Sequence, residues 1–268
     1  MNFNIQPINF NIANVRFKSN SNISQPKGSD LERNPKMDSF EMSIGYVNDA
    51  HGQTNNMMRI LSGIKGDLKL SAGDNDIGDE KNDAIHQATT KFLNIADIKA
   101  SALGNHEIDM SQKDCIDAIN RFNGLMLSIN FEQIPLEEQD PEDIQKYGRA
   151  DLKNHLTKSA VVEVKGEKIG LIGASPIDMM SRLTHPNYYT DCSVDDLDDT
   201  IELIQNEIDK FKEQNINKVI LVSHLGHKAD KFVAENIDGI DVIVGGHTHE
   251  LIKDIKEGEN LLYSKTGE

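Results

Sequence analysis

The chain has 268 residues, enough to bury a substantial hydrophobic core as one large domain or two small ones. Its 28 Lys and Arg residues against 44 Asp and Glu residues give a formal net charge of −16. This balance argues against non-specific binding to nucleic acid or to an anionic membrane, because both need clustered basic side chains. The sequence contains no run of 18 apolar residues and therefore predicts no transmembrane helix.

The first 38 residues differ in character from the rest of the chain. They are rich in Asn, Ser and Pro and show little hydrophobic periodicity, which is typical of a disordered tail. We therefore expect residues 1–38 to form an Asn-rich tail and residues 39–268 to form the folded domain. Residues 1–25 lack the continuous apolar core of a secretion signal, so a cytoplasmic location is expected.

Short apolar runs alternate with helical patterns along the folded region. The expected strands are residues 43–47, 68–72, 100–103, 160–164, 168–173, 219–222, 241–244 and 261–264. The expected helices are residues 54–64, 80–96 and 194–212. A Lys-Gly-Glu turn signal between residues 160–164 and 168–173 predicts that these two strands form a hairpin.

The second half of the chain carries the clearest patterns. Apolar residues recur at i, i+3, i+4 and i+7 along 194–212, and Ser193 is the expected N-cap of this helix. The β-branched runs at 219–222 and 241–244 fit strands that are buried on both faces. The alternation of strands and helices predicts a layered α/β fold, in which ligands bind at the carboxyl ends of the strands.

Five polar clusters follow expected strands. They are NDAHG (48–52), GDN (73–75), GNHEID (104–109), SHLG (223–226) and GGHTH (245–249). Taken singly, an Asp-x-His or Ser-His pair is usually structural or solvated, and a Gly-Asp pair is usually a turn. Their joint occurrence, each at the end of an expected strand, is what indicates a functional site.

The residue types in these clusters indicate a dinuclear metal site. Imidazole and carboxylate groups without thiolates suit Zn, Mn, Fe or Co. Two ions about 3.5–4 Å apart need a ligand that bridges them, and a carboxylate has two oxygens for this. Bound cations would also let an anionic phosphate approach a chain of this negative charge. Two other polar residues, Asp76 and His86, are expected at the surface; for Asp76 the alternative is that it tunes the site.

The five clusters together resemble the signature of the calcineurin-like metallophosphoesterases. GNHEID is similar to the GNHEFD block of the 5'-nucleotidase and 2',3'-cyclic-nucleotide phosphodiesterase branch, and VKGEKIGLIGASP (164–176) resembles its connecting hairpin. The resemblance extends over about residues 43–268. It implies an α/β fold built as a four-layer αββα sandwich, with the metal site at the carboxyl ends of the strands.

The resemblance also implies a role for each matching residue. A first divalent metal ion is expected to be held by Asp49, His51 and His249, and a second by Asn105, His224 and His247. Asp74 is expected to bind both ions. The catalytic pair is expected to be His106 and Asp109.

The implied reaction is metal-dependent hydrolysis of a small phosphate ester by a metal-bridging hydroxide, with nucleoside 5'-monophosphates as the expected substrates. Cyclic-nucleotide phosphodiesterase and nucleotide-sugar diphosphatase activities are alternatives within the family. A non-catalytic domain that binds metal or a partner is an alternative of another class. Members of the family carry a second domain that stacks the nucleobase, and we expect residues 39–268 to be a catalytic domain without it.

Overall fold

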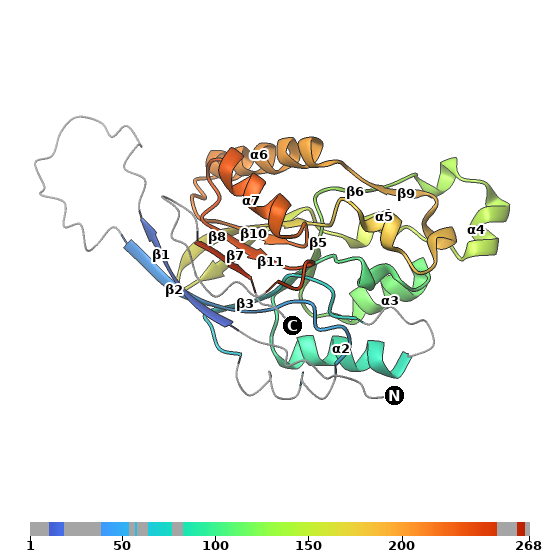
Figure 1. Cartoon of the computed structure of the whole chain (residues 1–268), viewed down its shortest axis with the longest axis horizontal. Helices are drawn as coiled ribbons and strands as arrows, with labels where there is room; N and C mark the ends of the chain where they lie inside the picture. Colours follow the sequence, from blue (N-terminus) through green and yellow to red (C-terminus); the bar gives the residue numbers. More distant parts are fainter. Residues whose placement is uncertain are drawn as a thin grey trace, which may run out of the picture.

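Two β-sheets form the centre of the fold in the computed structural model, which describes residues 11–18, 39–53, 57, 64–76, 83–250 and 262–265 (Figure 1). The first sheet has the order β1-β2-β3-β4-β5 and the second the order β12-β11-β10-β8-β7. The first comprises β1 (Asn11–Lys18), β2 (Ser39–Val47), β3 (Leu68–Ser71), β4 (Ala100–Ala102) and β5 (Leu125–Leu127). The second comprises β7 (Ser159–Val164), β8 (Glu167–Ala174), β10 (Val219–Ser223), β11 (Val242–Gly245) and β12 (Leu262–Lys265).

Most strands in each sheet run parallel. In the first sheet β2 to β5 are parallel and β1 is antiparallel to β2. In the second sheet β8, β10, β11 and β12 are parallel, and β7 pairs antiparallel with β8, which confirms the predicted hairpin. The carboxyl ends of the parallel strands therefore meet at one edge of each sheet.

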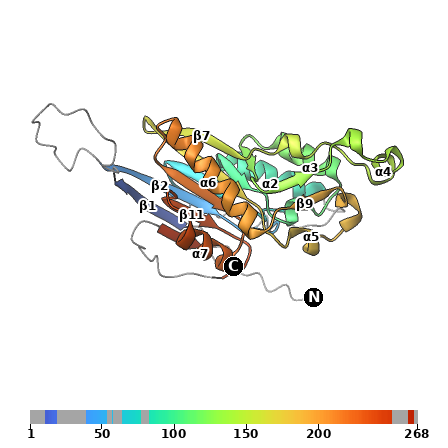
Figure 2. The same ribbon diagram turned by 90° about the horizontal axis from the view of Figure 1, so that it is seen from above.

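Helices cover the outer faces of both sheets. Helix α2 (Asp83–Ile95) packs on the first sheet, where Phe92 joins a cluster with Val47. Helices α6 (Leu197–Glu213) and α7 (His227–Asn236) pack on the second sheet. Figure 1 shows α6 and α7 above the strands and α2 below them, and Figure 2 shows α6 running along its sheet.

The main hydrophobic core lies between the two sheets. Leu70 of β3 and Ala100 of β4 belong to one buried cluster with Leu171 of β8 and Val222 of β10. Helix, sheet, sheet and helix thus follow one another as four layers, which confirms the expected αββα sandwich.

Smaller elements follow the carboxyl ends of β4, β5 and β8. They are η1 (His106–Ile108), α3 (Gln112–Arg121), β6 (Phe131–Gln133), η2 (Leu136–Glu138), α4 (Pro141–Tyr147), η3 (Lys153–His155), α5 (Met179–Arg182), η4 (Pro186–Tyr189) and β9 (Cys192–Val194). Strands β6 and β9 pair antiparallel, and a separate buried cluster packs them together with η1, α3, α5 and η4. They line the same end of the molecule as the predicted site.

The expectation of a disordered tail over residues 1–38 is wrong for residues 11–18. These residues form β1, which pairs along its whole length with β2 from Asn11 opposite Tyr46 to Lys18 opposite Ser39. Ala13, Val15 and Phe17 alternate with polar residues in this segment, which is the period of a half-buried strand. The high Asn content hid this alternation, and the rest of residues 1–38 lies outside the described residues.

The helices expected at residues 54–64 and 194–212 have different outcomes in the structure. The expected helix at 54–64 falls outside the described residues except for Met57 and Ile64. The N-cap of α6 is Asp196, whose side chain accepts a hydrogen bond from the Asp199 N–H, so the prediction of Ser193 is wrong. Ser193 lies in β9 opposite Glu132, and this pairing keeps the chain extended there. No helix in the described part of the chain is both long enough and apolar enough to cross a bilayer.

Candidate metal centre

The predicted ligands all lie directly after strands of the two sheets. Asp49 and His51 follow β2, Asp74 follows β3, Asn105 follows β4, His224 follows β10, and His247 and His249 follow β11. Because these strands are parallel to their neighbours, their ends bring residues from distant parts of the sequence to one place.

The ligand atoms form two groups, and Asp74 belongs to both. One group contains Asp49, His51, Asp74 and His249, and the other contains Asp74, His224 and His247. Within each group one ligand atom of every residue lies within 4.8 Å of all the others. The two groups contain the residues that the family resemblance implied for the first and the second ion, apart from Asn105, which neither group includes.

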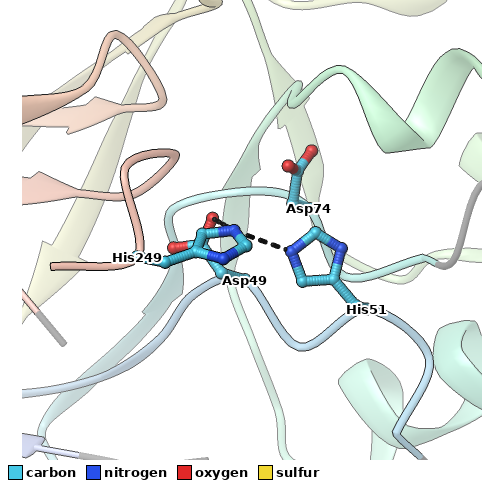
Figure 3. Close-up of side chains that lie close together, drawn as sticks. All are labelled: Asp49, His51, Asp74 and His249. Atoms are coloured by element: carbon cyan, nitrogen blue, oxygen red, sulfur yellow. Dashed lines mark hydrogen bonds and ion pairs between the residues drawn. The ribbon is translucent and has the colours of Figure 1, made fainter. Parts of the chain in front are cut away.

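The first group joins loops from both sheets, as Figure 3 shows. His51 Nε2 and His249 Nε2 lie 2.9 Å apart, and His249 Nε2 lies 3.5 Å from Asp49 Oδ1. The backbones of the two loops from the first sheet are also tied together, because the His51 N–H donates to the Asp74 carbonyl at 3.0 Å. The ligands are therefore held by the loops before any ion binds.

Most of these ligands have a backbone conformation that is unusual for residues other than glycine. Positive φ angles occur at Asp49 (50°), His51 (45°), Asp74 (51°), His247 (84°) and His249 (51°). Such residues cost of the order of 1–3 kcal/mol each and persist where the surrounding structure holds them in place. Their concentration at the five ligands indicates that the loops are shaped for the site.

Glycines make room for His224 at the centre of the second group. A Cβ atom on Gly73 or on Gly246 would lie 2.8 Å from His224 Nδ1. The Nδ1 atom itself lies 2.5 Å from the Ala72 carbonyl oxygen, and the whole residue is buried. Only glycine therefore allows the two loops to close around this imidazole.

Glu107 is a buried residue of the GNHEID motif to which sequence reasoning assigned no role. Its carboxylate accepts N–H groups from Asp74 at 3.0 Å, Asn75 at 2.7 Å and Gly104 at 2.8 Å. It therefore joins the loop after β3 to the loop after β4 and fixes the backbone of Asp74. An acid between His106 and Ile108, inside the motif, was the available signal.

His106 and Asp109 form the predicted pair at the edge of the first group. His106 Nδ1 lies 2.5 Å from Asp109 Oδ2, and Asp109 Oδ1 accepts the Thr184 N–H at 2.8 Å. The His106 ring centre lies 4.8 Å from that of His51. The side chain of Asp109 is fully buried and that of His106 is 31% exposed, so the imidazole can be reached from solvent.

The charged groups of the centre shift one another's pKa. Burial lowers the pKa of His224, but Asp74 and Asp49 outweigh this effect and raise that pKa to about 9. Burial raises the pKa of Asp74, but His224 outweighs it and holds that pKa well below its usual range. Burial and His224 lower the pKa of His247 to about 4. The two buried carboxylates thus favour a positive charge at this place, which a bound cation would supply.

Two of the predicted ligand atoms are buried without a hydrogen bond in the described part of the chain. They are Asn105 Oδ1 and His224 Nε2, the latter lying 3.0 Å from Asp74 Oδ2. Buried polar atoms without a hydrogen bond are rare in proteins. Divalent cations coordinated by imidazole, carboxylate and amide groups would satisfy both atoms, so the residues fit the implied ions.

The two polar residues expected at the surface are in fact buried. Asp76 is 5% exposed, His86 is also 5% exposed, and His86 Nδ1 lies 2.6 Å from Asp76 Oδ1. The expectation was wrong because the face of α2 that carries His86 packs towards the loop after β3. The contact between the two side chains gives each of these buried polar groups a hydrogen-bond partner.

Comparison with known proteins agrees with this geometry. A family model described as calcineurin-like phosphoesterase matches residues 42–251. The chain therefore belongs to the calcineurin-like phosphoesterase family, whose members use divalent metal ions.

Several proteins related to the chain carry nucleotidase names. It is 32% identical over 162 residues to a 5'-nucleotidase from Diplobatis ommata, in a match that covers 60% of this chain and 25% of that protein. It is 32% identical over 248 residues to an apyrase from Anopheles gambiae, covering 81% of this chain and 40% of that one. The crystal structure of a 5'-nucleotidase precursor from Thermus thermophilus has the same fold, with a TM-score of 0.63 at 24% identity over 83% of this chain and 44% of that one. The chain thus spans less than half the length of these relatives.

Proposed function

We propose that this chain forms the catalytic domain of a dinuclear metal-dependent phosphoesterase that releases phosphate from nucleoside 5'-monophosphates. The observation that carries the reaction type is the pair of ligand groups that share Asp74, with the His106–Asp109 pair beside them. The nucleotide substrate is supported by the similarity to a 5'-nucleotidase and to an apyrase.

Two divalent cations would be held by the two groups. The first ion would be held by Asp49, His51 and His249, and the second by Asn105, His224 and His247. Asp74 would bind both ions. The donor set suits Zn, Mn, Fe or Co. Bound there, the cations would supply Lewis acidity for activating water near neutral pH and for offsetting charge on the phosphoryl oxygens.

His106 has the position of a proton donor. Asp109 accepts the hydrogen on Nδ1 of His106, so Nε2, on the other side of the ring, is the nitrogen that gains or loses a proton. The hydrogen bond to Asp109 raises the pKa of His106 and outweighs the opposing effect of burial. The charged imidazole would then donate its Nε2 proton to the leaving oxygen of the ester.

Phosphate release by the purified chain tests this proposal. With Mn²⁺ supplied, AMP should release phosphate at a rate well above that of the same protein after treatment with a chelator. A parallel panel of 2',3'-cyclic AMP, a nucleotide sugar and a simple aryl phosphate separates the substrate classes. Turnover of the aryl phosphate but not of AMP would reject the nucleotide substrate. No metal-dependent turnover of any ester by folded, metal-loaded protein would reject the reaction type.

A further inference from the structure

Asp178 lies against the second ligand group, although no sequence motif includes it. Its Oδ1 atom lies 3.1 Å from Nε2 of His247, a side chain that is 9% exposed. Asp178 directly precedes α5, in the segment that follows β8. It therefore reaches the site from a segment that carries none of the predicted ligands.

The contact determines which ring nitrogen of His247 carries a hydrogen. A carboxylate has only acceptor atoms, so the nitrogen that faces it must be the one that bears the hydrogen. A histidine that binds a metal ion is neutral and has a single ring N–H. With Nε2 protonated by this argument, Nδ1 of His247 keeps the lone pair that an ion needs.

His224 shows the opposite arrangement in the same group. Its Nδ1 atom lies 2.5 Å from the carbonyl oxygen of Ala72, which can only accept, so Nδ1 carries the hydrogen. In a neutral His224 bound to an ion, Nε2 is therefore the nitrogen that keeps its lone pair. It lies 3.0 Å from Asp74 Oδ2, a group that would bind the same ion. Each histidine of the group thus has one nitrogen that faces an acceptor outside the metal centre.

Asp178 is itself held in place on its other side. Arg182 Nε lies 2.5 Å from Asp178 Oδ2, one helical turn along α5. The guanidinium is a permanent cation with a fixed set of donors, so it leaves Oδ1 to His247. The backbone of His247 is fixed separately, because its N–H donates to Asp49 Oδ1 at 2.8 Å. Asp178 therefore acts on the imidazole ring of His247 and not on its backbone.

We propose that Asp178 is a positioning residue that holds His247 as the Nε2–H tautomer and so leaves Nδ1 to bind the second metal ion. This inference rests on the proposed metal site. Carboxylates that orient a metal-binding imidazole typically change metal affinity by about 10–100-fold when they are removed.

The test uses Asp178→Ala with two measurements. In chelator-treated protein labelled with ¹⁵N-histidine, the ring signals of His247, assigned by their loss in His247→Gln, should show the Nε2–H tautomer in the wild type and a mixture of tautomers in the variant. In calorimetric titrations with Mn²⁺, the variant should bind one of its two ions about 10–100-fold more weakly and the other unchanged.

Two variants serve as controls. Asp178→Asn keeps an oxygen that can accept the Nε2 hydrogen, so it should keep the wild-type tautomer and lie between the other two proteins in metal affinity. Asp117→Ala removes an exposed carboxylate that pairs with Lys113 on α3, away from the site, and should leave both measurements unchanged.

The two measurements separate this inference from the proposed function. An Asp178→Ala protein with the wild-type tautomer of His247 and both wild-type affinities would overturn the role of Asp178. A wild-type chain that binds fewer than two ions would instead count against the metal site. The tautomer measurement would still decide the contact between Asp178 and His247 in that case, because it needs no metal.

Discussion

His106 is the residue of the centre that can be changed without removing a proposed metal ligand. It is half-buried beside His51 and hydrogen-bonded to Asp109. A general acid typically contributes about 10²–10⁴-fold to turnover, so His106→Ala should lower kcat by about that factor. Bound metal per chain should stay at the wild-type value. A variant that keeps full turnover would show that His106 is not the proton donor.

The contact with Asp109 predicts how kcat should depend on pH if His106 is the proton donor. This hydrogen bond raises the pKa of His106, and a group with a raised pKa stays protonated up to a higher pH. Asp109→Asn removes the negative charge, so the pKa of His106 should fall. The alkaline limb of the kcat profile should then move to lower pH, since the proton needed by the leaving group is lost earlier. An unchanged alkaline limb would assign that limb to another group.

At the residue scale, the polar clusters could be located because each follows an expected strand, and the expected ligands within them came from the family resemblance. Glu107 and Asp178 could not be predicted, because their roles depend on contacts across the fold. Glu107 binds the N–H of Asp74, 33 residues away, and Asp178 lies against His247, 69 residues away. No local pattern in the sequence encodes such distant contacts.

At the scale of elements, the position of the α6 N-cap can be measured. Asp196 accepts the Asp199 N–H at 3.0 Å, and an N-cap of this kind is worth about 1 kcal/mol. Asp196→Ala should lower the free energy of unfolding in urea by that amount. Ser193→Ala changes an equally exposed residue and should stay within about 0.5 kcal/mol of the wild type. A larger loss of unfolding free energy in Ser193→Ala than in Asp196→Ala would show that Ser193 is the N-cap.

The elements that the sequence located best were those with strong, local periodicity. The hairpin β7–β8 and the buried strands β10 and β11 were found where expected. Strand β1 was missed because its alternation of apolar and polar residues is short and lies among Asn residues. Its extended conformation is stabilised mainly by pairing with β2, a contact that the local sequence does not show. The start of α6 was misplaced because β9 pairs with β6, a contact that propensity alone does not contain.

At the scale of the whole molecule, the layered fold explains how a chain of net charge −16 could act on an anion. The two sheets bring carboxylates and imidazoles from six positions to one end of the core, where divalent cations would reverse the local charge. The alternation of elements predicted a layered α/β fold, and the family resemblance implied the four layers. The packing of the small elements around β6 and β9 could not be predicted, because their sequences are too short to show a periodicity.

The central claim is a centre for two ions with Asp74 between them. The most direct test is the amount of Mn²⁺ that remains bound per chain after loading and removal of free metal. Asp97→Asn is a matched control, because Asp97 (φ 60°) shares the positive φ of Asp74 (φ 51°) but is an exposed residue outside both groups. Wild type and Asp97→Asn should each retain two ions. Asp74→Asn should retain one or none, since an amide has a single oxygen. Two ions in Asp74→Asn, or fewer than two in the wild type, would contradict the claim.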